Sequence, residues 1–99
     1  MKAFNEILEH IPEELEDAEE YARMALHYKH ENRALADTYA ELAKQELGHE
    51  DMLHSMAHAL LAEHPEEDHG WAKHIWEWEC GKATDKRSKV KVMLEMYRK

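Results

Sequence analysis

The sequence predicts an all-α protein built from an antiparallel helical hairpin followed by a C-terminal helical region. Only three Gly and two Pro occur among 99 residues, and the β-branched residues number three Ile, two Val and two Thr. This composition leaves too little turn and strand material for a sandwich or a barrel. The length allows a single domain, residues 1–99, and excludes an enzyme with separate cofactor and substrate domains.

The first long helix is expected from about Pro12 to about His30. Residues 1–10 are predicted to form only a short amphipathic turn, because a residue that precedes proline is pushed out of the helical region. Proline suits a first helical position, and the acidic residues after Pro12 lie where the positive end of the helix dipole stabilises them. The hairpin therefore begins at about residue 12.

A break near Glu31 and Asn32 is expected to separate this helix from a second one that runs from Arg33 to His64. Pro65 ends the second helix because proline cannot continue it. The two helices make a core hairpin over about residues 12–64, and its short connection predicts that they lie antiparallel.

The segment HPEEDHG predicts a turn, after which a helical region covers about residues 71–97. Gly81 is expected to interrupt that region before a last helical stretch from about Asp85 to Tyr97. Its first part is apolar on more than one side, so we expect it to pack on the hairpin or on a neighbouring subunit. The residues that carry this expectation are Trp71, Ile75, Trp76 and Trp78.

The net charge of −9 is unevenly divided, since residues 1–70 hold 18 acidic and 5 basic side chains and residues 71–99 hold 4 and 8. An acidic body repels nucleic acid and attracts cations, so a nucleic-acid partner is not expected. The basic end is interpreted as a solvated helix end. No apolar run is long enough for a membrane span or a secretory signal, and Cys80 has no partner for a disulfide. We expect a soluble, cytoplasmic protein.

One face of the second helix combines apolar residues with two ionisable ones. Its members follow one another at spacings of four and three, the interval of a single helical face. They are Leu35, Tyr39, Leu42, Glu46, His49, Leu53, Met56 and Leu60. Glu46 and His49 lie in the middle of this stripe, one turn apart, as an ExxH pattern.

The first helix has a similar stripe that starts with a carboxylate and consists of Glu14, Ala18, Tyr21, Ala25 and Tyr28. Glu14 and Glu46 lie 16 residues on either side of position 30, so an antiparallel hairpin brings them to the same height. Two carboxylates and the His49 imidazole then converge in a water-poor seam that contains no Lys or Arg. Since unpaired buried charge is costly, a metal ion such as iron, manganese or zinc is the expected partner.

A single hairpin supplies only three ligands and leaves one side of the seam uncovered. A second copy related by a two-fold axis would complete a four-helix bundle in which four carboxylates and two imidazoles surround two metal ions. The sequence therefore predicts a homodimer with a shared di-metal site, and it leaves a higher homo-oligomer open as an alternative.

The spacing of these residues resembles the half-repeat of ferritin-like di-iron proteins, in particular rubrerythrins and encapsulated ferritins, over about residues 12–60. The matching order is Glu14, six residues, Tyr21, then Tyr39, six residues, Glu46, two residues, His49. The resemblance implies that Glu14 and His49 are terminal ligands and that Glu46 bridges the metals. It gives Tyr21 a hydrogen-bonding role beside the site. The implied activity is oxidation of Fe(II) by oxygen or peroxide, that of a ferroxidase-type oxidoreductase.

Other interpretations of these residues stay open at this point. Glu46 and His49 could form a polar pair that only fixes register in a metal-free helical interaction or assembly protein. Glu14 could be explained by the helix dipole alone, and Glu20 is its nearest rival, although it belongs to a solvated face. Two further expectations concern neighbouring residues: a weak flanking ion site at Glu50, His54 and His58, and a packing role for Tyr28 and Tyr39.

Overall fold

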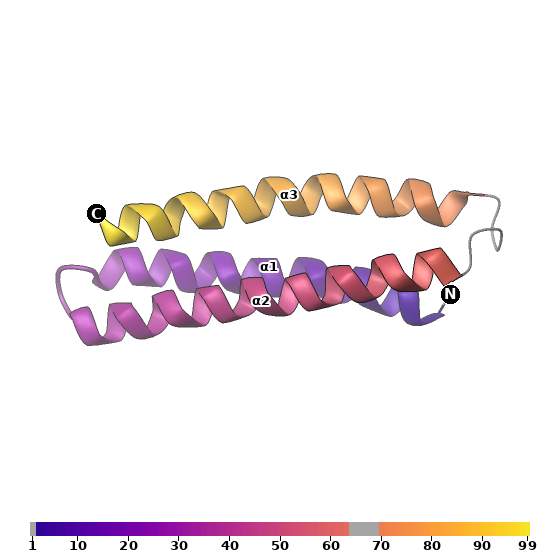
Figure 1. Cartoon of the computed structure of the whole chain (residues 1–99). Helices are drawn as coiled ribbons and strands as arrows, with labels where there is room; N and C mark the ends of the chain where they lie inside the picture. The colour runs from indigo at the N-terminus through magenta and orange to yellow at the C-terminus, as the bar shows by residue number, and fades with distance from the viewer. Residues whose placement is uncertain (1, 64–69) are drawn as a thin grey trace.

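The structure is a computed structural model that describes residues 2–63 and 70–99 and consists of three long helices (Figure 1). Helix α1 spans Lys2–Tyr28, α2 spans Arg33–Glu63 and α3 spans Trp71–Arg98. They run along the long axis of a molecule that measures 54 × 18 × 15 Å. The predicted all-helical fold is confirmed. Gly70, the last residue of the turn predicted over residues 64–70, lies in a turn, whereas the rest of that segment and the helix end predicted at Pro65 lie outside the described residues.

Helices α1 and α2 form the predicted antiparallel hairpin (Figure 1). The break between them falls at the expected place, because α1 ends at Tyr28 and α2 begins at Arg33. Asn32 caps α2, since its side-chain oxygen accepts a hydrogen bond from the backbone N–H of Leu35 at 3.1 Å. Such a cap satisfies a donor that the first turn of a helix leaves unpaired.

Helix α1 begins ten residues earlier than predicted, because it starts at Lys2 and continues through Pro12. The prediction that residues 1–10 form only a short turn is wrong. A proline inside a helix costs about 3 kcal/mol, and the burial of Phe4 and Ile11 in the core opposes this cost. The ring of Phe4 packs on Trp76 of α3, with centroids 6.1 Å apart.

Helix α3 is also continuous, and the predicted interruption at Gly81 is wrong. Its buried face extends on both sides of Gly81 and holds Ala72, Trp76, Ala83, Val90, Leu94 and Tyr97. At the C-terminal end, the Tyr97 hydroxyl donates a hydrogen bond to Asp37 of α2. The Lys29 ammonium donates another to the Met96 carbonyl at 2.9 Å. Tertiary packing along the whole helix outweighs the weak helix preference of one glycine.

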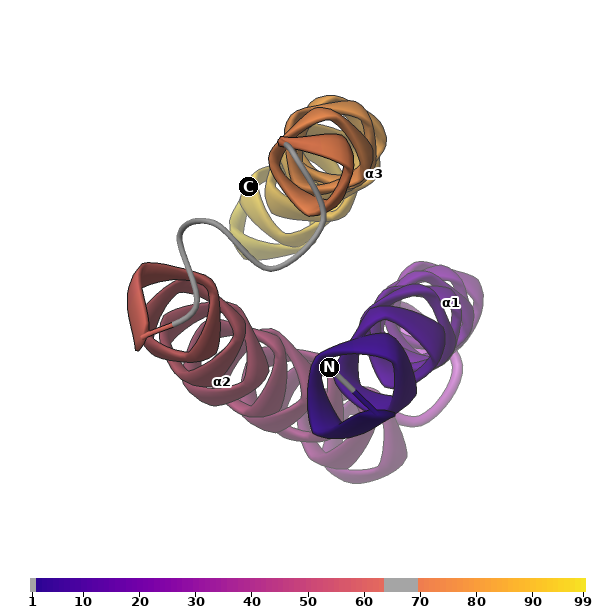
Figure 2. The ribbon, with the colours of Figure 1, turned by 90° about the vertical axis from the view of Figure 1, so that its right-hand side faces the viewer.

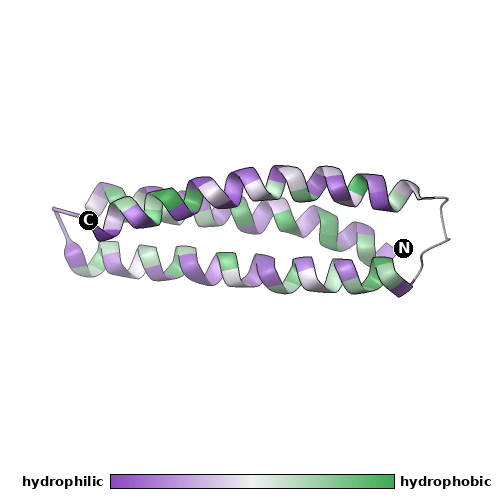
Figure 3. Cartoon of the chain, turned by 45° about the horizontal axis from the view of Figure 1, so that its top comes forward, coloured by the Kyte–Doolittle hydropathy of each residue, from purple (hydrophilic) through white to green (hydrophobic). Residues whose placement is uncertain are grey.

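Helix α3 lies over one side of the hairpin and packs more extensively on α1 than on α2 (Figure 2). Apolar and polar residues alternate along all three helices, as Figure 3 shows, which is typical of amphipathic helices. Small side chains line the hairpin core and allow its helices to approach closely; they are Ala18, Ala22, Ala25, Ala36, Ala40 and Ala43. Within residues 2–63 and 70–99, no helix is long and apolar enough to cross a bilayer.

Candidate metal centre

The predicted stripe of α2 does not lie at the centre of the hairpin core. The buried residues of α2 are Ala36, Ala40, Ala43, Leu47, Glu50 and Ala57. Each of the six follows a member of the predicted stripe by one position, a rotation of about 100° around the helix. Six of the eight stripe residues are half-buried, and His49 and Met56 are exposed. The stripe is therefore a flank of the hairpin that one chain covers only in part.

We call this flank the open seam. It consists of Glu14, Tyr21 and Tyr28 from α1 and Leu35, Tyr39, Leu42, Glu46, His49, Leu53, Met56 and Leu60 from α2. The seam faces away from α3. Glu19 and Asp51 form ion pairs with α3. Glu14 precedes Glu19 by five residues, and Glu46 precedes Asp51 by five, which is a rotation of about 140° around each helix.

The open seam brings the three predicted metal ligands together. The Nδ1 atom of His49 lies 3.4 Å from Oε2 of Glu14 and 3.8 Å from Oε1 of Glu46. One ligand atom from each of the three residues can be chosen so that all lie within 4.8 Å of one another. The prediction that α1 and α2 place these residues at one height is confirmed, and the three side chains lie close enough together to hold a metal ion.

Glu46 lies in an electrostatic environment that disfavours its charged form. The pKa of Glu46 rises to about 7, because the Glu14 carboxyl group lies beside it and because burial disfavours its charged form. Its Oε2 atom is buried and has no hydrogen-bond partner among the described residues. His49 is the only ion-pair partner of Glu14 and Glu46 within residues 2–63 and 70–99. These carboxylates therefore lack a permanent positive partner.

Tyr21 lies two helical turns from Glu14, and the structure places it in a stack of aromatic rings. Its ring stacks on Tyr39 with centroids 6.2 Å apart, and Tyr39 stacks in turn on Tyr28 at 6.1 Å. This arrangement agrees with the expected packing role of Tyr28 and Tyr39. The hydrogen-bonding role that the resemblance implies for Tyr21 stays a prediction.

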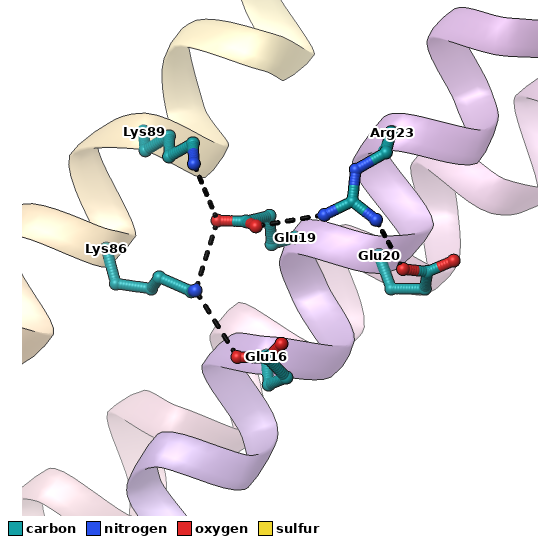
Figure 4. A network of polar contacts seen from close by, with 6 residues as sticks. All are labelled: Glu16, Glu19, Glu20, Arg23, Lys86 and Lys89. Carbon is teal, nitrogen blue, oxygen red and sulfur yellow. Dashed lines mark hydrogen bonds and ion pairs between the residues drawn. The ribbon is translucent and has the colours of Figure 1, made fainter.

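Sequence reasoning missed two buried carboxylates, and Glu19 is the first of them. It is 7 % exposed, and three cations surround it: Lys86 at 3.2 Å, Lys89 at 3.3 Å and Arg23 at 2.9 Å (Figure 4). Burial alone raises the pKa of Glu19, but hydrogen bonds from Lys86 and Lys89 hold it below its usual range. Glu20 pairs with Arg23 on the exposed side of α1, in agreement with its expected place on a solvated face (Figure 4).

Glu50 is the second buried carboxylate, and it is 2 % exposed. The Arg87 guanidinium donates to its Oε2 atom at 2.5 Å and also to the Leu47 carbonyl at 3.2 Å. The flanking ion site expected at Glu50, His54 and His58 is therefore not assembled. Glu50 already holds a cation, His54 packs against Trp76 with centroids 4.6 Å apart, and His58 is exposed.

These contacts also correct the interpretation of the basic C-terminal region as a solvated helix end. Lys86, Arg87 and Lys89 of α3 form ion pairs with acidic residues of the hairpin. The opposite charges of the two parts of the chain, −13 for residues 1–70 and +4 for residues 71–99, were the available signal. These opposite charges predict that the two parts of the chain attract each other, but they do not identify the carboxylates with which α3 forms ion pairs.

Comparison of the chain with known protein families, curated proteins and solved structures gives no match.

Proposed function

We propose that this chain is a ferritin-like di-iron protein that oxidises Fe(II) with oxygen or peroxide, at a site which two copies of the chain complete. One observation carries the proposal. Two carboxylates and an imidazole converge on the open seam, and Glu46 keeps a buried oxygen without a hydrogen-bond partner among the described residues.

The donor set fits a divalent first-row metal. Carboxylate and imidazole ligands suit iron, with manganese and zinc as possible substitutes. A cation would also relieve the repulsion that raises the pKa of Glu46. The basic residues of α3 do not serve this purpose, because Lys86, Arg87 and Lys89 are engaged on the other side of the hairpin.

Glu14 and His49 would act as terminal ligands and Glu46 as the bridge between two ions. Bound as a pair, Fe(II) ions supply the electrons that reduce oxygen or peroxide. The chain's own contribution is to fix the positions of the three donors and to attract cations through its acidic hairpin. The exposed imidazole of His49, 55 % of whose side chain is accessible, leaves the site open on its outer side.

The second copy follows from the number of ligands and from the surface around them. Three side chains leave a metal ion with an incomplete ligand set. The apolar members of the open seam, among them Leu42, Leu53 and Met56, are only partly covered within one chain. A two-fold pairing of seams would bury these residues and supply the missing donors, since such an interface presents the same patch from both copies.

The proposal is tested by titrating the metal-free chain with Fe(II) without oxygen, and then measuring oxygen consumption. We expect one ion per chain in the unmodified protein, and loss of both binding and oxidation in Glu46→Ala and His49→Ala. Glu41→Ala and His58→Ala are matched controls, because both residues are exposed on α2 outside the open seam. Equal binding and equal oxygen consumption in all five proteins would contradict the proposal.

The open seam also favours a second candidate, a metal-free helical interaction protein. Its partly exposed apolar residues would drive association without any ion, and Glu46 with His49 would only fix the register. That candidate predicts a stable dimer which binds no Fe(II), Mn(II) or Zn(II) and whose melting temperature none of these ions changes.

A further inference from the structure

The large apolar side chains that stay exposed in the described chain are concentrated on two surfaces. Met52 and Met56 are exposed on α2, and Met56 belongs to the open seam. The other four lie on α3: Trp71 at 66 %, Trp78 at 68 %, Val92 at 59 % and Met96 at 54 % exposed. Two exposed tryptophans on one helix are unusual for a surface that faces only water.

The four exposed residues of α3 belong to one continuous stripe, which we call the outer stripe. It consists of Trp71, Ile75, Trp78, Lys82, Asp85, Lys89, Val92 and Met96. Their spacings alternate strictly between four and three, the pattern of a helix that pairs with another helix in a coiled coil. The stripe lies beside the buried face of α3, because Trp71, Ile75, Lys82 and Lys89 each precede a buried residue by one position.

The outer stripe is apolar at both ends and charged in the middle. Trp71, Ile75 and Trp78 occupy its N-terminal part, and Val92 and Met96 occupy its C-terminal part. Lys82, Asp85 and Lys89 lie between them. When two such helices lie antiparallel, the apolar end of one meets the apolar end of the other, and Lys82 of each can lie opposite Asp85 of the other.

We propose that the outer stripe is a second self-association surface, on which α3 pairs antiparallel with α3 of another copy. In an antiparallel coiled coil, each a position of one helix lies opposite a d position of the other helix. One register pairs all eight positions. It matches Trp71 with Met96 of the partner subunit, Ile75 with Val92 of the partner subunit, Trp78 with Lys89 of the partner subunit, and Lys82 with Asp85 of the partner subunit.

The contacts in this register have favourable chemistry, and Lys89, which pairs with Glu19 at 3.3 Å within one chain, keeps 64 % of its side chain exposed toward a partner. Methionine sulfur packs well against an aromatic ring, and two aliphatic side chains form the next layer. A lysine ammonium attracts the face of a tryptophan ring, as Lys82 already does with Trp78 at 5.7 Å within one chain. The two Lys–Asp pairs lie next to the two-fold axis, where opposite charges fix the register.

Charge complementarity also selects a second copy in this orientation over a parallel pair. A parallel arrangement would place Lys82, Asp85 and Lys89 each opposite its own copy, and like charges would repel. An antiparallel register shifted by seven residues would leave two apolar positions at one end of each stripe without a partner, either Trp71 and Ile75 or Val92 and Met96.

The outer stripe and the open seam lie on different sides of the molecule, so one chain can use both at once. The open seam belongs to α1 and α2 and faces away from α3, whereas the outer stripe belongs to α3 alone. Two different two-fold interfaces on one chain generate assemblies larger than a dimer. This inference does not depend on metal binding, because none of the outer-stripe residues belongs to the candidate metal centre.

The first test compares the mass of the full chain with that of Trp78→Lys/Val92→Lys by sedimentation over a range of concentrations. Both positions are exposed, so circular dichroism should show an unchanged helical content. We expect the double variant to form smaller assemblies than the unmodified chain at every concentration, with its open-seam pairing retained. Identical mass distributions would overturn the proposal.

The register is tested by reversing the central charges. Lys82→Asp places two carboxylates opposite each other, and we expect it to raise the dissociation constant of this contact at least tenfold. Adding Asp85→Lys restores opposite charges across the axis and should return the constant to within threefold of the original. The ion pair of Lys82 with Glu79 at 3.1 Å is lost in both variants, so its loss cannot explain a difference between them. Absence of recovery would overturn the antiparallel register.

Discussion

Glu46 and Glu50 of α2, four residues apart, differ in the charged groups that surround them. Glu50 is almost fully buried and holds the Arg87 guanidinium at 2.5 Å. Among the described residues, Glu46 has His49 as its ion-pair partner, and the carboxyl groups of Glu14 and Asp17 act on it from nearby. A protein that needed both carboxylates only for structure would gain from pairing each with a cation. The asymmetry supports a role for Glu46 that requires an open coordination position.

The pH dependence of stability should reveal the state of Glu46. Its pKa of about 7 lies above the usual value of 4.5, so the folded chain binds this proton more tightly than the unfolded chain does. The resulting stabilisation is complete below about pH 4.5 and is lost as the pH rises through 7. Without metal, Glu46→Gln should remove this loss, which is of the order of 3 kcal/mol.

The measurement is urea unfolding with a chelator present at pH 5 and pH 8. Glu41→Gln is the matched control, because Glu41 is exposed on the same helix. A difference between pH 5 and pH 8 that is the same in the unmodified chain, Glu46→Gln and Glu41→Gln would contradict this account of Glu46.

Removal of Arg87 should destabilise the fold strongly. Arg87→Leu leaves the Glu50 carboxylate buried without a cation, and breaking a buried pair in this way costs about 3–5 kcal/mol. Glu50→Leu/Arg87→Leu should recover most of that loss, because no uncompensated charge remains. Lys91→Leu, at an exposed position of α3, should change the free energy of unfolding by less than about 0.5 kcal/mol. A single variant at Arg87 as stable as the Lys91 control would disprove the assignment.

The helices themselves were largely predictable from the sequence, and their exact extent was not. The hairpin, its break before Arg33 and the shared height of Glu14 and Glu46 follow from helical spacing, which is a local property. Local rules failed at Pro12 and Gly81, where contacts with distant residues such as Trp76 keep the helices intact. The pairing of Glu19 and Glu50 with α3 was missed for the same reason, since the partners lie 37 or more residues away.

Two glycines should respond in opposite directions to replacement by alanine. Gly81 lies inside α3, and an added Cβ would meet no atom within 4 Å. Gly81→Ala should therefore stabilise the chain by up to about 1 kcal/mol, the difference in helix preference. Gly70, at the start of the same helix, has a φ of 88°. Gly70→Ala should destabilise it by about 1–2 kcal/mol, because that backbone conformation disfavours a side chain.

Thermal unfolding of the two variants beside the unmodified chain measures this difference. A lower melting temperature for Gly81→Ala would show that α3 is not continuous through residue 81.

In the whole molecule, α3 covers one side of the hairpin and leaves the open seam on the other side uncovered. On one side, Lys86, Arg87 and Lys89 neutralise buried carboxylates and hold α3 in place. On the other side, the open seam keeps uncompensated carboxylates among partly exposed apolar residues. The surface around Glu46 is therefore the one on which the proposed second copy would pack.

Disruption of the open seam should weaken that pairing without unfolding the chain. Met56 is 53 % exposed, so Met56→Glu should keep the helical content and weaken association through the seam about tenfold or more. Ser55→Glu is the control, because Ser55 is exposed and lies about 100° further around α2. Sedimentation of both variants in the Trp78→Lys/Val92→Lys background isolates this contact. Equal association of the two proteins would contradict a seam-to-seam dimer.

The most direct test of a shared metal centre is the native mass of the chain after loading with Fe(II) under anaerobic conditions. The mass reports the number of chains and the number of bound ions in the same particle. We predict an even number of chains with one ion per chain, and loss of the ions in Glu46→Ala. Single chains that retain a bound ion, or pairs that carry none, would contradict the account.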